Sequence, residues 1–139
     1  IVGGPLMPED RRYFNELKNQ VKRFGLEKNV EFLGPKTYRE IPDILRAHDI
    51  FINLSATGSL DKAVFEAMAC GLSVLTSNEA YGDILPPDYF LDSRDPKHIA
   101  ARIRKLIDEP RPIMALRNIV EEAHSLDGTI GNIIRYLSE

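Results

Sequence analysis

One short segment of the chain brings together residue types that can bind an anion and sugar hydroxyl groups. Residues 53–77 read NLSATGSLDKAVFEAMACGLSVLTS, which predicts the end of a strand, a polar loop, a short helix and a second strand. The stretch AVFEAMAC is almost entirely apolar, so the helix is expected to be buried on most sides, yet it carries Glu66. Because an unpaired buried carboxylate is costly, Glu66 is a candidate for a functional role.

The residues at the two ends of this helix are typical of helix caps. Ser59 is a suitable N-cap, Leu60 would be the first helical residue, and Asp61 would lie near the positive end of the helix dipole. Gly71 occupies the C′ position, where the backbone usually takes a positive φ. A helix start that follows a loop of Gly, Ser and Thr offers backbone N–H groups to an anion. The segment therefore predicts a site for an anion and for sugar hydroxyls.

Lys62 and Glu66 are four residues apart, so they share one face of the predicted helix with Ser59. A structural explanation is open beside the functional one, because an ion pair at this spacing stabilises a helix by about 0.3 kcal/mol. Lysine before glutamate is the weaker order, so the ion pair by itself explains little.

The segment closely resembles the C-terminal domain of retaining GT-B glycosyltransferases of family 4, also called group 1. The run EAMACG that begins at Glu66, followed by SVL, matches the second half of the E-x7-E helix motif of that family. Three further pieces stand in the family's order, namely IVGG at 1–4, NVEFLG at 29–34 and AHDIFINLS at 47–55. The resemblance extends from residue 1 to about residue 110, and the order of the pieces is more specific than any one of them.

The resemblance implies a site for a nucleotide-diphosphate sugar, the donor substrate. Backbone groups at 58–62 would bind the diphosphate, Glu66 would accept hydrogen bonds from the ribose, and the loop at 34–37 would meet the base. For Lys36, a phosphate contact and a solvated side chain are both open. The predicted donor-binding residues are Gly34, Pro35, Lys36, Gly58, Ser59, Leu60, Asp61, Lys62 and Glu66. The catalytic residues stay unassigned, and neither a metal nor a cofactor beyond the nucleotide sugar is expected.

One position departs from the family's pattern. Eight residues before Glu66 the family has a glutamate that contacts the donor sugar, and this chain has Gly58. The family also has an Arg and a Lys for the diphosphate in a segment before the IVGG-like strand, at which the printed sequence starts. Two alternatives therefore stay open: a catalytically inactive binding module of the same fold, and another GT-B enzyme such as a nucleotide-sugar epimerase.

Strands alternate with helices along the chain, which predicts an α/β fold with a doubly wound parallel sheet. The resemblance makes this a Rossmann-like, C-terminal half of a GT-B fold with extra C-terminal helices. The predicted strands cover residues 1–4, 30–33, 50–54, 73–76 and 89–91. The predicted helices cover residues 8–24, 38–47, 60–70, a stretch from Pro96 to before Pro110, residues 114–123 and a last helix near the C-terminus.

Two of these helices have predicted caps, and the last one has an apolar stripe. Thr37 with Glu40 forms a capping-box pattern before the second helix. Asp127 or Thr129 is expected to cap the last helix, whose stripe we expect to pack on a neighbouring element or on an absent domain. The stripe consists of Ile130, Ile133, Ile134 and Leu137.

Length and composition exclude several classes of protein. A chain of 139 residues is enough for one domain with a core, and a net charge of −3 argues against a nucleic-acid surface. Its apolar runs are shorter than the roughly 20 residues of a membrane-spanning helix. The only cysteine, Cys70, excludes an internal disulfide and is expected to be a packing residue. No histidine has a partner at metal-ligand spacing, and no Asp-x-Asp motif occurs.

The sequence thus predicts the donor-binding domain of a hexosyltransferase that uses a glycan or lipid-linked acceptor. Since Ile1 already lies in a strand, we expect residues 1–139 to be one domain that lacks its first strand–helix unit and an N-terminal acceptor-binding domain. Without that partner domain, these residues alone are expected to be inactive. By analogy with the family, the setting is polysaccharide biosynthesis in the cytoplasm, with peripheral membrane association through the missing domain.

Overall fold

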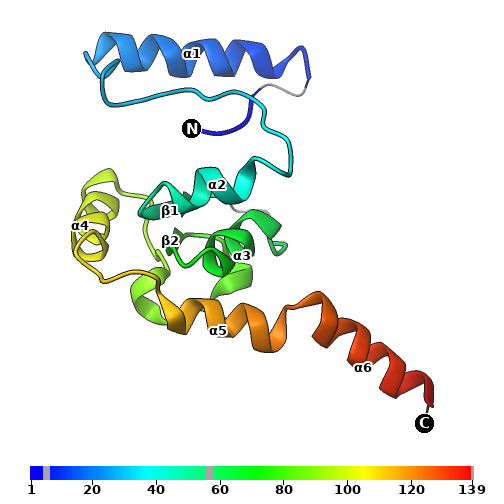
Figure 1. Ribbon diagram of the computed structural model, residues 1–139. Coiled ribbons are helices and arrows are strands. Elements are labelled where there is room, and N and C mark those ends of the chain that lie inside the picture. The colour runs from blue at the N-terminus through cyan, green and yellow to red at the C-terminus, as the bar shows by residue number, and fades with distance from the viewer. Residues whose placement is uncertain (5–6, 56–57, 139) are drawn as a thin grey trace. The chain divides into compact units, whose positions relative to one another are not determined.

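The computed structural model describes residues 1–4, 7–55 and 58–138 of the chain. The chain divides into two compact units, residues 1–41 and 42–139, and each is described by itself. The idea that residues 1–139 form one domain stays a prediction. Beyond the first helix the elements are α2 (Ile41–Arg46), β1 (Ile50–Asn53), α3 (Lys62–Ala69), β2 (Ser73–Thr76), the 3-10 helices η1 (Glu79–Tyr81) and η2 (Pro87–Tyr89), α4 (Pro96–Leu106), α5 (Met114–Ala123) and α6 (Leu126–Ser138) (Figure 1).

The first unit consists of helix α1 (Asp10–Arg23) and two extended segments that pair in parallel. Val2 forms a parallel bridge with Gly34, and the Gly3 amide donates a hydrogen bond of 2.9 Å to the Gly34 carbonyl. The predicted helix over 8–24 is confirmed. The strands predicted over 1–4 and 30–33 are wrong, because the pairing is limited to this single bridge.

Aromatic packing joins α1 to the segment that precedes Gly34. The rings of Phe14 and Phe32 meet edge to face, with centroids 5.4 Å apart. The Lys18 ammonium lies 4.5 Å from the centroid of the Phe14 ring, a distance at which a cation is attracted to the ring face. Helix α1 therefore packs through Phe14 and Lys18 into a small aromatic cluster within the first unit.

The second unit contains a parallel pair of strands. Ile50 lies opposite Ser73 and Asn53 lies opposite Thr76, so β1 and β2 end at the same edge. Phe90 adds a single parallel bridge to Thr76. The strands predicted over 50–54 and 73–76 are confirmed, whereas the strand predicted over 89–91 is wrong, because Pro86 and Pro87 lead into η2, which includes Tyr89.

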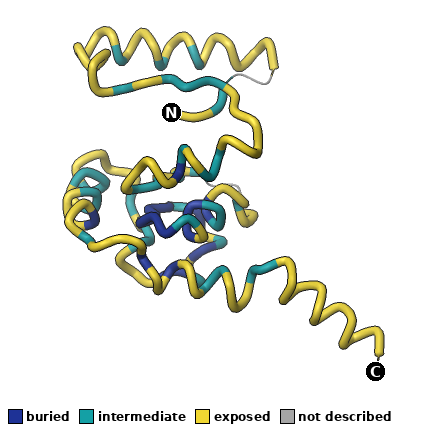
Figure 2. Tube along the Cα trace, in the orientation of Figure 1, coloured by how far each residue is buried: buried dark blue, intermediate teal, exposed yellow. Residues whose placement is uncertain are grey.

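Helices cover this sheet on both sides, which explains why every residue of β2 is buried. Figure 1 shows the two strands between α4 on one side and α3 on the other, and Figure 2 shows the buried residues gathered there. Leu75 of β2 packs with Leu91 and with Leu106 of α4. On the other side α3 buries Val64, Ala67 and Met68, and α5 packs against α3.

Helix α3 begins later than the sequence predicts. Its first residue is Lys62, and Asp61 is the N-cap residue with an extended backbone at φ −78° and ψ 113°. Ser59 is therefore not the N-cap, and Leu60 lies outside the helix. The Ser59 carbonyl accepts a hydrogen bond of 2.8 Å from the Asn78 side chain, which fixes the chain just before the helix.

The C-terminal end of α3 is as predicted. Gly71 has a φ of +81°, and its amide donates to the Met68 carbonyl at 2.9 Å. The Leu72 amide donates to the Ala67 carbonyl at 3.1 Å, which completes a Schellman motif. Gly71 thus stops the helix and turns the chain into β2.

The caps of the other helices agree only in part with the sequence. The Glu40 carboxylate accepts a 2.8 Å hydrogen bond from the Thr37 amide, as in a capping box, but α2 begins at Ile41 rather than at residue 38. Helix α6 begins at Leu126, so the caps predicted at Asp127 and Thr129 are wrong. The reason is that the Ser125 hydroxyl accepts from the Gly128 amide at 3.2 Å and supplies the cap.

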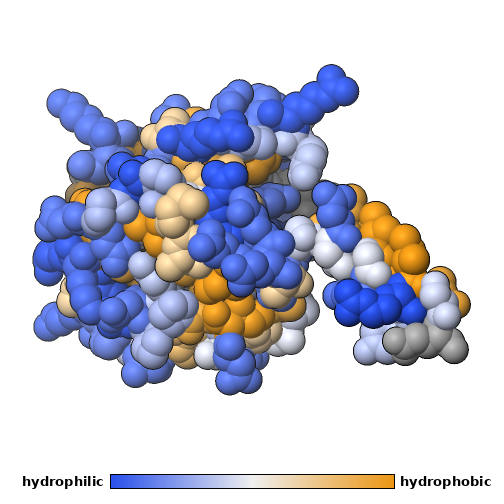
Figure 3. All heavy atoms as spheres, turned by 60° about the horizontal axis from the view of Figure 1, so that its bottom comes forward, coloured by the Kyte–Doolittle hydropathy of each residue, from blue (hydrophilic) through white to orange (hydrophobic). Residues whose placement is uncertain are grey.

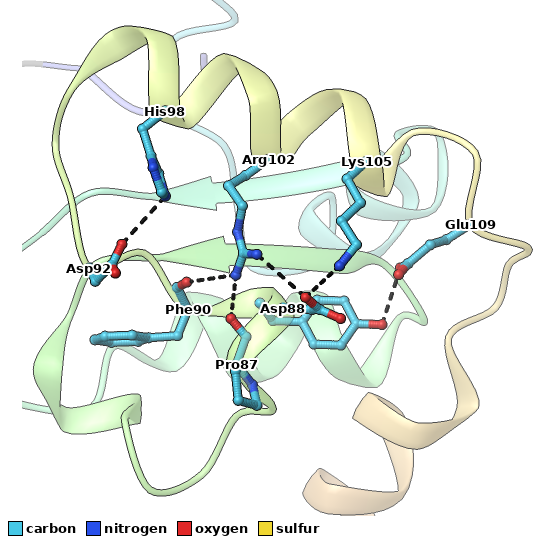
Figure 4. A network of polar contacts seen from close by, with 9 residues as sticks. Pro87, Asp88, Phe90, Asp92, His98, Arg102, Lys105 and Glu109 are labelled. Atoms are coloured by element: carbon cyan, nitrogen blue, oxygen red, sulfur yellow. Dashed lines mark hydrogen bonds and ion pairs between the residues drawn. The ribbon is translucent and has the colours of Figure 1, made fainter.

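Charged side chains fasten α4 to the segment that contains η2 (Figure 4). Arg102 contacts Asp88 and also donates to the carbonyls of Pro87 and Phe90. Lys105 donates to the same Asp88 carboxylate at 2.6 Å, and this hydrogen bond holds the pKa of Asp88 below its usual range.

After the end of α4, the Glu109 carboxylate joins η2 to β2. It accepts hydrogen bonds from the Tyr89 hydroxyl at 3.1 Å and from the Ser73 hydroxyl at 3.0 Å. Burial, and then the Glu109 charge, raise the pKa of the Tyr89 hydroxyl to about 12. The phenol is therefore neutral over the physiological range and stays a hydrogen-bond donor.

Helix α6 carries exposed apolar side chains, which Figure 3 shows as a hydrophobic surface along the helix. The exposed apolar residues on α6 are Leu126, Ile130, Ile133, Ile134, Tyr136 and Leu137. The predicted stripe is thus present on a helix, but it is not buried by the described residues, and its docking on another domain stays a prediction. None of the helices in the described ranges is both long and apolar enough to cross a membrane.

The replacement Gly71→Ala tests how α3 is stopped. A Cβ at Gly71 would lie 2.6 Å from the Pro112 Cβ, and the φ of +81° is strained for alanine. We expect the free energy of unfolding to fall by about 2 kcal/mol or more, measured by urea denaturation. Gly131→Ala in α6 is the control, because its Cβ would meet nothing within 4 Å. Equal stability of the two variants would contradict the interpretation.

Candidate functional site

Polar side chains gather where β1 and β2 end. Asn53 is the last residue of β1, Ser55 follows it closely, and Thr76 is the last residue of β2, with Asn78 two residues later. Because the strands are parallel and in register, these residues share the carboxyl edge of the sheet. Open α/β sheets bind their ligands at this edge.

The Asp61 carboxylate is the centre of this cluster. Its Oδ2 atom accepts hydrogen bonds from Asn53 Nδ2 at 3.1 Å, from Ser55 Oγ at 2.5 Å and from Asn78 Nδ2 at 3.2 Å. These donors, Ser55 first, hold the pKa of Asp61 below its ordinary value, against the opposing effect of burial. Asp61 therefore ties the start of α3 to the ends of both strands as an ionised carboxylate.

Asn78 completes the cluster and is fully buried. Its backbone N–H donates to the Thr76 hydroxyl at 3.1 Å, and its side-chain oxygen accepts from the Ala80 backbone N–H at 3.1 Å. Its side-chain nitrogen donates to the Ser59 carbonyl at 2.8 Å as well as to Asp61. Through its backbone amide and its side chain, Asn78 thus connects the end of β2, the start of η1 and the segment before α3.

Tyr81 also fixes the segment before α3. The side chain is fully buried, and its hydroxyl donates to the Asp61 carbonyl at 2.6 Å. Burial, and then the Asp61 charge, raise the pKa of Tyr81 to about 12. The ring packs against Phe65 of α3, with centroids 5.2 Å apart. Tyr81 is therefore a packing residue of the core.

The first turn of α3 follows residues 59–61, which Asn78 and Tyr81 hold in place. Because Asp61 points into the cluster, its side chain makes no capping hydrogen bond to the helix. The first N–H groups of an α-helix lack partners within the helix, so they can serve a ligand. Lys62 is exposed and Glu66, one turn later, is half-buried. Within the described part of the chain no ion pair joins Lys62 to Glu66, which leaves the structural explanation of that pair without support.

Gly58 comes just before residues 59–61 and lies next to the Glu79 carboxylate of η1. Its φ is +67°, a value that glycine adopts without strain. A Cβ built on Gly58 would lie 3.5 Å from Oε1 of Glu79, the first residue of η1. Ala56 and Thr57, which belong to the predicted polar loop, lie outside the described residues.

The remaining predicted site residues belong to the first compact unit. Gly34 has a φ of +69°, and its carbonyl accepts from Gly3. Pro35 lies against Gly4, at 3.5 Å from the position of a Cβ there. Lys36 Nζ lies 3.6 Å from the Glu40 carboxylate, so its charge has a partner within the unit. The structure thus brings together the predicted residues at 58–66, whereas those at 34–36 belong to the other unit.

The residues that build the cluster were largely missed by sequence reasoning. Asn53 is the last residue of β1, and Ser55 and Asn78 come two residues after the ends of β1 and β2; polar residues at strand ends are a signal that could have identified them. Asp61 was predicted for its charge near the helix dipole, whereas it acts through three side-chain donors. Among the residues that the structure describes, no group of three or more His, Cys, Asp or Glu is placed to hold a metal ion.

The pH dependence of stability tests the anchoring role of Asp61. A lowered pKa in the folded state stabilises the protein above about pH 4, and this contribution is lost as the pH falls below that value. We therefore expect Asp61→Asn to be less stable than the wild type at pH 7, with a difference that shrinks below pH 4. Urea denaturation between pH 3 and pH 7 measures this difference.

The matched control is Asp83→Asn, because Asp83 is an exposed carboxylate in the turn after η1. It should follow the wild type at every pH. A difference between Asp61→Asn and the wild type that is constant from pH 7 to pH 3 would contradict the assignment.

Comparisons with known proteins place this architecture among glycosyl transferases. The chain is 41% identical to mannosylfructose-phosphate synthase of Agrobacterium fabrum over 71 residues. These residues are 50% of this chain and 16% of that protein. The chain is 31% identical to a phosphatidylinositol N-acetylglucosaminyltransferase subunit of Arabidopsis thaliana over 109 residues, which are 77% of this chain and 23% of that protein. The chain thus spans less than a quarter of either relative.

A solved structure and a family model agree with these relatives. The crystal structure of Anabaena HepE in complex with UDP and glucose matches 99% of this chain and 39% of the HepE chain, with a TM-score of 0.81 and 21% sequence identity. This match confirms the predicted α/β fold with a parallel sheet. The sequence model described as Glycosyl transferases group 1 matches residues 1–125. The chain therefore belongs to the group 1 family of glycosyl transferases, as its motifs predict.

Proposed function

We propose that this chain is the donor-binding part of a glycosyltransferase. The reaction is transfer of a hexosyl group from a nucleotide-diphosphate sugar to a glycan or lipid-linked acceptor. Support comes from the group 1 family match and from HepE, whose similar structure holds UDP and glucose. Two relatives, a mannosylfructose-phosphate synthase and an N-acetylglucosaminyltransferase subunit, carry names that denote sugar-transferring enzymes.

The observation that carries the proposal is the fixed start of α3. The Asp61 carboxylate binds side chains from the ends of both strands, so the first turn of the helix is held at the carboxyl edge of the sheet. Backbone N–H groups at this position bind the diphosphate of the donor, and the Lys62 ammonium adds positive charge. These donors are in place before the reaction begins.

The same groups stabilise the products of bond cleavage. When the bond between the sugar and the diphosphate breaks, its electron pair remains on the diphosphate oxygen, and negative charge grows there. Preorganised N–H groups and Lys62 favour that charge without reorganisation. Glu66 accepts hydrogen bonds from the two ribose hydroxyls, which orients the nucleotide along α3.

The rest of the enzyme supplies the acceptor site. Because the chain spans only part of its relatives, we assign the acceptor and the remaining catalytic groups to an N-terminal domain. We further propose a cytoplasmic enzyme of polysaccharide biosynthesis that associates with the membrane through that domain.

The variant Glu66→Gln tests the nucleotide site in the full-length protein. Titration calorimetry with UDP, GDP and ADP identifies the base, and the same nucleotide is then titrated into the variant. We expect the dissociation constant to rise about ten- to a hundredfold, because hydrogen bonds to a charged acceptor are lost.

Glu122→Gln is the matched control, since Glu122 is an exposed glutamate on α5. It should bind nucleotide like the wild type, and circular dichroism should show all three proteins folded. Equal affinities for Glu66→Gln and Glu122→Gln would refute the role of Glu66. Nucleotide binding without transfer or hydrolysis of any donor would favour an inactive module.

A further inference from the structure

Glu79 is a carboxylate at the edge of the sheet that the proposed mechanism does not use. It is exposed, and it is the first residue of η1, three residues after the end of β2. In the described part of the chain its side chain has neither a hydrogen bond nor an ion pair. It is therefore available to a ligand.

The backbone of Glu79 is held firmly on both sides. On one side Asn78 is fully buried, and its side-chain oxygen accepts from the Ala80 amide. On the other side the Tyr81 hydroxyl donates to the Asp61 carbonyl, and the Tyr81 amide donates to the Asn78 carbonyl at 3.0 Å. The backbone from which the Glu79 side chain extends is therefore fixed at the carboxyl edge of the sheet.

The carboxylate lies over Gly58. Its Oε1 atom is 3.5 Å from the position that a Cβ of residue 58 would take. With a φ of +67°, residue 58 favours glycine, so its backbone stays bare. Glu79 from η1 therefore supplies an acidic group beside the segment that leads into α3, at a position where the chain itself has no side chain.

The position of Glu79 relative to α3 indicates which part of a donor it meets. Glu66 follows the helix start by one turn, about 6 Å along the axis, whereas Gly58 precedes the helix start in the chain. In a nucleotide sugar the ribose and the sugar lie at opposite ends of the diphosphate. With the ribose at Glu66 and the diphosphate at the helix start, the sugar extends toward Gly58 and Glu79.

The chemistry of a carboxylate agrees with this placement. An ionised carboxylate only accepts hydrogen bonds, so it repels a diphosphate and binds hydroxyl groups. We propose that Glu79 is a specificity-determining residue that accepts hydrogen bonds from hydroxyls of the donor sugar. This inference rests on the proposed function, because it requires a nucleotide sugar at the start of α3.

The test compares the intact donor with its nucleoside diphosphate in the full-length protein. Calorimetric dissociation constants are measured for both ligands with the wild type, Glu79→Gln and Glu79→Ala. We expect both variants to bind the intact donor about ten- to a hundredfold more weakly, because charged hydrogen bonds are lost. The affinity for the nucleoside diphosphate should stay within about twofold of the wild type.

A second measurement uses donors with the same nucleotide and different hexoses, such as glucose, galactose and mannose. In Glu79→Gln the order of affinities among these epimers should change, which a purely structural role would not produce. Asp83→Asn is the matched control, because Asp83 is another exposed carboxylate in the same turn region. It should keep both affinities and the order of sugars.

Two results would overturn the inference about Glu79. One is an unchanged donor affinity in both variants, and the other is an equal loss for the donor and the nucleoside diphosphate. Either result, with nucleotide binding still lost in Glu66→Gln, leaves the proposed function intact. If the wild type binds no nucleoside diphosphate and no nucleotide sugar, the proposed function itself fails, and the inference fails with it.

Discussion

The hydrogen bonds to the Asp61 carboxylate hold the carboxyl edge of the sheet and the start of α3 together. Three donors from Asn53, Ser55 and Asn78 converge on one carboxylate oxygen. A partly buried carboxylate loses hydration, and these donors replace the lost water contacts. Without them the Asp61 side chain would no longer join the start of α3 to the ends of β1 and β2, and Asp61 makes no capping hydrogen bond to the helix.

This arrangement separates the groups that build the site from those that can bind a ligand. The polar atoms of Asn78 are all occupied within the protein, and the Tyr81 hydroxyl is committed to the Asp61 carbonyl. Groups with internal partners are poor ligands, because binding would first break the existing hydrogen bonds. The side chains of Lys62, Glu66 and Glu79 make none of these hydrogen bonds, and they are the ones that we propose for the donor.

Helix α3 is fixed at its two ends by different physical means. At the start, charge and hydrogen bonding at Asp61 set its position. At the end, Gly71 closes a Schellman motif and approaches Pro112 so closely that a Cβ would not fit. Apolar packing of Val64 and Met68 fills the length between. A helix of eight residues is too short to be stable alone, so its position depends on these contacts.

The sequence by itself determined the elements whose cause is local. Apolar runs and glycine stops predicted β1, β2 and the end of α3, since a buried strand and a C′ glycine depend on neighbouring residues. The motif around Glu66 identified the family, whereas the donor-binding role of the residues at 58–66 stays a prediction. Short pairings such as Val2 with Gly34 were overestimated as strands, because pairing length depends on distant partners.

Only the tertiary structure decided the start of α3 and the membership of the polar cluster. Ser59 has the right chemistry for an N-cap, but Asn78, 19 residues away, donates to its carbonyl, and the helix begins at Lys62 instead. Glu79 meets Gly58 only because the parallel register brings the ends of β1 and β2 to one edge. Contacts between residues far apart in the chain leave no periodic signal in the sequence, and therefore only the folded chain reveals them.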